Sequence, residues 1–145
     1  MILSCNTSTK KQNALAEIER LVLLKVDKEF AAMSAAKGMK NAYLEYIDSN
    51  GVLLRPNSLP IVSAEAVDYI ISLKDTGYVI EWKPSKAVVA KSLELGYTYG
   101  VYKIEVPASG NIIFGTYITI WKKQAEGNWK FILQSNNEGV GNEPM

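Results

Sequence analysis

Tyrosine hydroxyls, scattered carboxylates and one arginine are the side chains of this sequence that could do chemistry. Histidine is absent, and cysteine occurs once, at Cys5. Without histidine, the serine and cysteine triads, imidazole acid–base catalysis and nearly all zinc and copper sites are excluded. One cysteine cannot form a disulfide within the chain. No pair of acidic residues has a spacing that indicates a shared site, so the sequence predicts neither a metal nor a cofactor.

Arg55 is the most suggestive single residue, because arginine is otherwise almost unused and this one ends the apolar segment 52–54. At the end of a strand its guanidinium could bind a ligand carboxylate or phosphate bidentately. The alternative is an ion pair with an acid of the same domain, for instance Glu81 or Glu94.

Aromatic residues alternate along the C-terminal third of the chain. Tyr97 and Tyr99 share one face of a strand, and Tyr117 lies on the next strand. Such a row could line a pocket and donate hydrogen bonds to a ligand carbonyl, or it could be core or a dimer surface. We expect these tyrosines to contact a ligand, with Trp82 at the rim of the pocket mouth.

Asp27 is the remaining carboxylate that could act as a general base. If it faced the pocket, apolar surroundings would raise its pKa. Its position between Lys25 and Lys28 favours a solvent-exposed face instead. Asp68 is interpreted in the same way.

The hydrophobic pattern predicts three helices and about six strands. In the first segment, apolar residues recur at helical spacing and form one stripe, at Ile18, Val22, Val26, Phe30 and Met33. Ser63 is the expected N-cap of the third helix. The three longest alternating segments, between Leu95 and Gln134, are separated by Gly- and Asn-containing turns and predict an antiparallel meander. The expected helices are 13–37, 39–47 and 64–73, and the expected strands are 52–55, 78–82, 87–93 and the three of the meander.

This order predicts an α+β fold of conical shape, in which a strongly curved, mostly antiparallel sheet wraps over a long N-terminal helix and two shorter helices. Such a sheet is not filled completely by side chains, which leaves an apolar pocket at one end. We expect one domain at 13–137, a disordered segment at 1–12 and a tail at 138–145.

Charge and hydropathy limit the kinds of partner that the protein is expected to bind. Sixteen basic and fifteen acidic residues are interspersed, so no basic stripe indicates nucleic acid. No apolar run is long enough to span a bilayer. The segment MILSCN resembles the end of a bacterial lipoprotein signal, with Cys5 as the lipidated residue. That interpretation predicts a location at the cell envelope, facing the periplasm, and the alternative is a frayed terminus on a cytoplasmic protein.

Four segments carry a family resemblance: FAAMSAAKGMKNAYLEYI, DSNGVLLRP, EWKPSKAVVAKSLELGYTYGVY and GTYITIWKKQAEGNWKFIL. Together they resemble the SnoaL-like branch of the nuclear-transport-factor-2-like superfamily, which includes ketosteroid isomerase. The resemblance covers about 18–137. It implies a cone-shaped fold with an internal pocket and a homodimer formed through the sheets.

Two positions depart from the family pattern. The resemblance places the proton-shuttling aspartate of ketosteroid isomerase at Arg55, just before Pro56, and a guanidinium cannot accept a proton near neutral pH. Many relatives end the last strand with an aspartate, where this chain has Gln134. A steroid isomerase of the known kind is therefore not expected, and Gln134 becomes a candidate ligand contact.

Three functions follow. The first is a non-enzymatic domain, or one with cryptic activity, that binds a small, largely apolar ligand. The second is an isomerase, dehydratase or cyclase acting on a ketone-bearing substrate, which requires a carboxylate buried within hydrogen-bond reach of a pocket tyrosine. The third is a dimerisation or assembly module, which predicts a pocket filled by the domain's own side chains and a large apolar sheet face.

Overall fold

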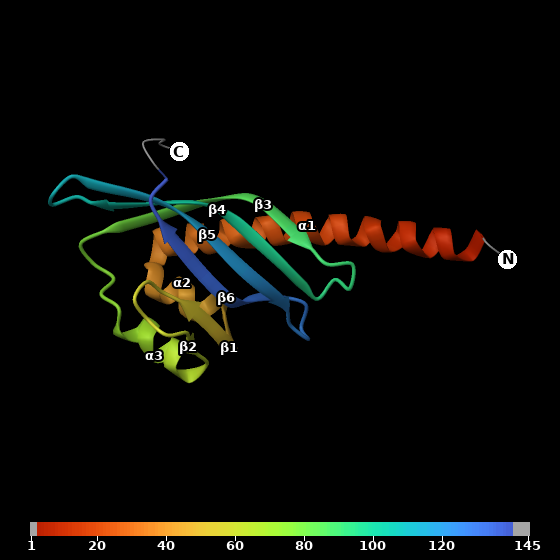
Figure 1. The fold of residues 1–145 in the computed structure, drawn as a ribbon, viewed down its shortest axis with the longest axis horizontal. Helices are drawn as coiled ribbons and strands as arrows, with labels where there is room; N and C mark the ends of the chain where they lie inside the picture. The colour runs from red at the N-terminus through yellow and green to blue at the C-terminus, as the bar shows by residue number, and fades with distance from the viewer. Residues whose placement is uncertain (1–2, 141–145) are drawn as a thin grey trace.

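The computed structural model describes residues 3–140, with side chains from residue 6. It has an α+β fold in which one six-stranded mixed sheet curves over a long helix (Figure 1). The elements are α1 (Leu3–Lys37), α2 (Met39–Tyr46), β1 (Ile47–Leu54), β2 (Ile61–Val62), α3 (Ala64–Ser72), β3 (Val79–Val89), β4 (Leu95–Val106), β5 (Asn111–Lys123) and β6 (Trp129–Glu138). The predicted fold class is confirmed.

The sheet has the strand order β2-β1-β6-β5-β4-β3. Strands β3 to β6 are antiparallel neighbours, as the predicted meander requires, and β1 joins the edge of β6 in parallel. Figure 1 shows α1 running along one face of the sheet, with its N-terminal part extending beyond the strands. The sheet thus has an inner face toward α1 and an outer face that no helix within residues 3–140 covers.

The boundaries of several elements differ from the sequence prediction. Helix α1 begins at Leu3, ten residues before the expected start, so the expected disordered segment is helical from that point. Two strands were predicted between 78 and 93, but β3 is continuous and shifts its register between Pro84 and Lys86. A bulge here accommodates a proline, which has no N–H to donate to the ladder. Ser63 occupies the N-cap position of α3, but its side chain makes no capping hydrogen bond.

The buried face of α1 is rotated from the one that the pattern indicated. Leu23, Asp27, Phe30 and Ser34 recur at helical spacing and are all buried, whereas Ile18, assigned to the apolar stripe, is 57% exposed. Positions separated by three or four residues share one side of a helix. This side faces the concave sheet, so whatever residue occupies position 27 must be buried.

Aromatic rings fill the space between α1 and the sheet. The Phe30 ring lies at the centre, with ring centroids of five neighbours within 5.9 Å: Tyr43, Tyr46, Trp82, Trp121 and Phe131. Trp129 and Phe131 are buried, and Phe131 packs against Phe30 of the first helix. This cluster fixes α1 against the sheet and forms one wall of the site described next.

Candidate functional site

Asp27 is fully buried, so the expected solvent-exposed face is wrong. Trp82 donates its indole N–H to Oδ1 at 2.9 Å, and Tyr117 donates its hydroxyl to Oδ2 at 2.8 Å. None of the ion pairs found in the described part of the chain involves Asp27. The carboxyl group is therefore held by neutral donors alone.

Burial and hydrogen bonding act on Asp27 in opposite directions. Burial raises its pKa, because a charge in an apolar interior loses its hydration, and the hydrogen bonds from Trp82, Tyr117 and Thr98 lower it in part. The net pKa lies above the ordinary value for an aspartate. Burial, followed by the nearby Asp27 charge, raises the pKa of Tyr117 well above its usual value, so this phenol stays protonated and remains a donor.

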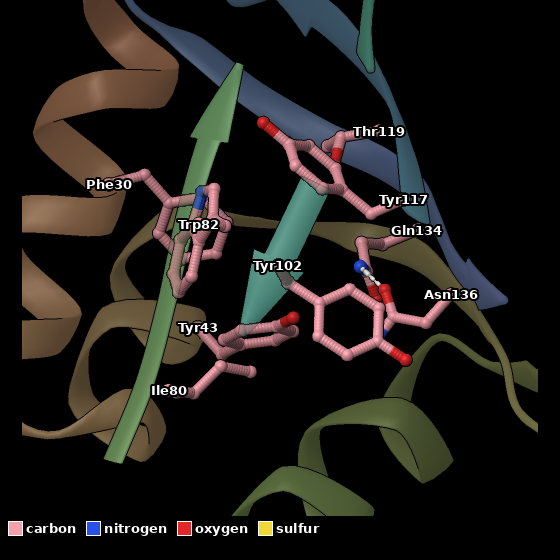
Figure 2. Close-up of a pocket in the computed structure, with 9 residues that line it drawn as sticks. All are labelled: Phe30, Tyr43, Ile80, Trp82, Tyr102, Tyr117, Thr119, Gln134 and Asn136. Atoms are coloured by element: carbon pink, nitrogen blue, oxygen red, sulfur yellow. Dashed lines mark hydrogen bonds between the residues drawn. The ribbon is translucent and has the colours of Figure 1, made fainter. Parts of the chain in front are cut away.

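Tyr117 and Trp82 also line an internal cavity (Figure 2). The cavity is mainly aromatic, and its volume is about 260 Å³ when the open mouth is included. The centre of a water molecule can occupy only about 10 Å³ of it, which is room for about one water. Its walls are Phe30, Tyr43, Ile80, Trp82, Tyr102, Tyr117, Thr119, Gln134 and Asn136.

The cavity has two polar sides. Figure 2 shows the hydroxyl of Tyr117 near the indole nitrogen of Trp82 on one side, and the amides of Gln134 and Asn136 on the other. Gln134 donates from Nε2 to Asn136 Oδ1, while its own Oε1 is buried without a hydrogen-bond partner. A buried acceptor without a partner costs about 1–3 kcal/mol. A ligand hydroxyl or a water that donates to Oε1 would remove this cost.

A bulge turns Gln134 into the cavity. In the β5–β6 ladder Ile120 pairs with Leu133 and Trp121 pairs with Phe131, so Ile132 is skipped. One extra residue reverses the side to which all later side chains point. Phe131 and Gln134 consequently both face inward, although simple alternation would place them on opposite faces.

Tyr97 and Tyr99 do not line this cavity. They lie on the outer face of β4, 39% and 44% exposed, whereas Tyr117 lies on the inner face and is buried. Only one of the three predicted tyrosines therefore reaches the site. Trp82 was expected at the rim and instead forms a wall with its N–H directed at Asp27.

The sequence prediction missed two apolar and four polar residues of the cavity wall: Phe30, Ile80, Tyr43, Tyr102, Thr119 and Asn136. A usable signal for Tyr102 was the run of small residues with the same parity on β4, Gly96, Thr98 and Gly100. A Cβ on Gly96 would lie 2.7 Å from a methyl carbon of Leu23, which marks this face as the one that α1 approaches. Gly115 marks the inward-facing side of β5 in the same way, because a Cβ there would lie 2.3 Å from the Tyr102 ring.

Arg55 lies outside the inner cavity, in a neighbouring open hollow lined by Leu54, Arg55, Pro56, Ser135, Asn136, Asn137 and Glu138. Its Nη1 donates to the carbonyl oxygens of Leu54 and Gln134, at 3.0 and 3.3 Å. The alternative ion pair with Glu81 or Glu94 is not formed, and Glu81 pairs with Lys103 instead.

Within residues 3–140, no cluster of three or more potential ligands could hold a metal ion. No helix of this region is long and apolar enough to cross a membrane. The side chain of Cys5 lies outside the described part, so its lipidation and a cell-envelope location remain predictions.

Comparisons with known proteins show which solved structures have a similar fold. Neither a protein family model nor a curated protein sequence matches the chain. Solved structures do match. An NTF2-like protein with a cystatin-like fold from Novosphingobium aromaticivorans is 12% identical, with a TM-score of 0.64, over 94% of this chain and 90% of its own. A ketosteroid isomerase-like protein from Erwinia carotovora atroseptica is 16% identical, with a TM-score of 0.59, over 78% and 94%.

The chain has the nuclear-transport-factor-2-like fold. The CaMKII hub of S. rosetta has it too, at 15% identity and a TM-score of 0.64, over 83% of this chain and 96% of its own. Proteins named as isomerase-like and as a hub thus share one architecture, so the fold alone does not assign a reaction. The function has to be argued from the residues of the cavity.

Proposed function

We propose that the protein binds a small, largely apolar, carbonyl-bearing molecule in the inner cavity, which widens from its room for about one water to admit it, and that Tyr117 and Asp27 together exchange a proton with it. The observation that carries this proposal is the 2.8 Å hydrogen bond between a buried carboxylate and a tyrosine of the cavity wall. Buried carboxyl groups with raised pKa values concentrate at functional sites. This arrangement meets the requirement stated for the enzymatic interpretation and favours it over binding alone.

The proton moves through Tyr117, because the phenol lines the cavity and Asp27 lies behind it. The C–H bond next to the carbonyl breaks, its proton passes to the phenolic oxygen, and the phenolic proton passes to Asp27 Oδ2. The electron pair of the C–H bond becomes the C=C bond of an enolate. Tyr43 directs its hydroxyl group into the cavity (Figure 2), where it can donate to the enolate oxygen, whereas the Tyr102 hydroxyl donates to the carbonyl oxygen of Asn137 at 3.4 Å. Return of the proton to another carbon is an isomerisation.

Proton exchange at the α-carbon tests this chemistry without knowledge of the natural substrate. We expect the protein to accelerate deuterium incorporation into 2-butanone or cyclohexanone in D₂O, followed by ¹H NMR. Asp27→Asn should lower the accelerated rate by about a hundredfold or more, the usual contribution of a positioned base. Tyr117→Phe should do the same, because the relay loses its middle group.

Asp68→Asn is the matched control, because it removes the same charge from an aspartate that is solvent-exposed. Its exchange rate should equal that of the wild type. If the ketones bind, as judged by saturation-transfer NMR, but exchange no faster than in buffer, proton transfer is wrong and the non-enzymatic binding function is the better one.

A dimerisation function is the second candidate, and the outer face of the sheet supports it. Leu95, Tyr97, Tyr99 and Ile118 are all at least 36% exposed there. Tyr99 and Ile118 are cross-strand partners, so the apolar groups are continuous from β4 to β5. Contiguous apolar surface of this kind is typical of protein contacts. We propose that two copies of the chain associate through it, and the narrow inner cavity is compatible with an assembly role.

The substitution Ile118→Glu is expected to convert the dimer to a monomer, because it places a charge at the centre of the apolar face. Light scattering coupled to size-exclusion chromatography measures the mass directly. Leu59→Glu is the control, since Leu59 is 86% exposed on the loop between β1 and β2. A wild-type protein that is monomeric at high concentration would contradict the dimer.

A further inference from the structure

We propose that the ligand of this site is a small monocarboxylate, whose apolar body enters the inner cavity as that cavity widens and whose carboxylate binds Arg55. This inference rests on the proposed function and specifies the chemical class of its ligand. It starts from the relation between two hollows. The inner aromatic cavity and the open hollow at Arg55 share Asn136 as a common wall.

The guanidinium of Arg55 is oriented so that it can bind an anion. Its side chain is half-buried, and Nη1 is fixed by two backbone carbonyl oxygens, which orients the planar guanidinium. Among the described residues no carboxylate forms an ion pair with it. An oriented arginine without an acidic partner binds a carboxylate with little loss of side-chain entropy.

The charge of Arg55 also reaches the inner cavity. Burial raises the pKa of Tyr43, and the positive charge of Arg55 opposes that rise. Tyr43 is a wall of the inner cavity. The positive charge of Arg55 therefore acts on a wall of the inner cavity.

The surroundings favour a single negative charge over a double one. Among the described residues that line the hollow, Arg55 is the one base and Glu138 is the one acid. Because the charges of Arg55 and Glu138 cancel, a phosphate dianion would bring two uncompensated negative charges into the hollow, whereas a carboxylate monoanion would bring one. The hollow is open, about 770 Å³ with its mouth, so a carboxylate there keeps part of its hydration.

Matched acid and amide pairs test the inference. We expect the protein to bind 4-oxopentanoate and phenylacetate at least about tenfold more tightly than 4-oxopentanamide and phenylacetamide, because a charge-assisted hydrogen bond is stronger than a neutral one. Dissociation constants come from ligand-observed NMR titrations. In Arg55→Met the ratio of acid to amide affinity should fall to about one, and in Arg55→Lys it should fall only in part.

Two further variants separate charge from fold. Arg20→Met makes the same substitution at a half-buried arginine that pairs with Glu17, and should keep the ratio of the wild type. Glu138→Gln removes the acid from the hollow and should strengthen acid binding a few fold. Circular dichroism and thermal unfolding show that each variant is folded.

The outcomes distinguish this inference from the function on which it rests. Equal binding of acids and amides overturns the carboxylate assignment and leaves the cavity function intact. Binding of phenyl phosphate more than tenfold tighter than phenylacetate overturns it in favour of a phosphate. If neither acid nor amide of either pair binds, the inference and the proposed ligand site both fail.

Discussion

Replacing Phe30 with alanine is expected to lower the free energy of unfolding by about 3–5 kcal/mol, the usual cost of removing a fully buried aromatic side chain. The Phe30 side chain is 2% exposed and lies among five other rings, so no neighbour can move into the vacated space without breaking its own contacts. Urea unfolding followed by tryptophan fluorescence measures this change, because Trp82 and Trp121 both contact Phe30.

Phe114→Ala is the matched control. Phe114 is half-buried on β5 and has no ring partner among the described residues. Its loss should cost about 1 kcal/mol, because less apolar surface is removed from the interior. Similar losses in the two variants would mean that Phe30 is not the centre of the core.

The meander is the part of the fold that the sequence predicted best. Its three strands are each ten or more residues long, and their turns contain the glycines that tight connections need. These signals are local, so they can be recognised in the residues themselves. The parallel pairing of β1 with β6 joins segments about eighty residues apart, and no local pattern specifies it.

The site was predicted less well, because burial of a single polar residue depends on the tertiary structure. The lysines beside Asp27 indicated a solvent-exposed face, yet residues 25 and 28 lie on other sides of the helix from residue 27. Asp27 is four residues after Leu23 and three before Phe30, and all three are buried. A stripe assigned with Leu23 and Phe30 as its centre would have placed Asp27 on the inner face.

Strand parity explains the remaining errors. Tyr97 and Tyr99 were assigned to the pocket by residue type, and the small residues between them, Thr98 and Gly100, mark the face that packs inward. Gln134 is a different case. It reaches the cavity only because β6 contains a bulge at Ile132, and a one-residue shift of this kind has no reliable signature in a sequence.

The stability of the protein is expected to fall with rising pH because of Asp27. Burial raises the pKa of Asp27 above its value in the unfolded chain, so the folded state holds this proton more tightly. The resulting stability is fully present below the unfolded pKa and is lost as the pH rises through the folded pKa. Within that window one group contributes a slope of at most about 1.4 kcal/mol per pH unit.

Asp27→Asn isolates this contribution. The asparagine oxygen can accept from Trp82, and its amide can donate to Tyr117, whose hydroxyl turns to become an acceptor. The free energy of unfolding of wild type minus that of Asp27→Asn should therefore decrease as the pH rises above about 4, where an unfolded aspartate titrates. Urea denaturation from pH 4 to pH 9 measures the difference, and a difference that increases with pH would contradict the direction of the shift.

Tyr117→Phe sharpens the test, because the Tyr117 hydrogen bond lowers the pKa of Asp27. Without this donor the charged form of Asp27 is less stable, and the pH window in which stability is lost should move upward.

Asp27→Ala should behave differently from both variants, since it leaves the Trp82 N–H and the Tyr117 hydroxyl buried without an acceptor. That variant should be destabilised by about 2–4 kcal/mol at low pH, where the wild-type carboxyl group is protonated and still accepts both hydrogen bonds. The same carboxyl group thus links the stability of the fold to the proton that the cavity is proposed to exchange.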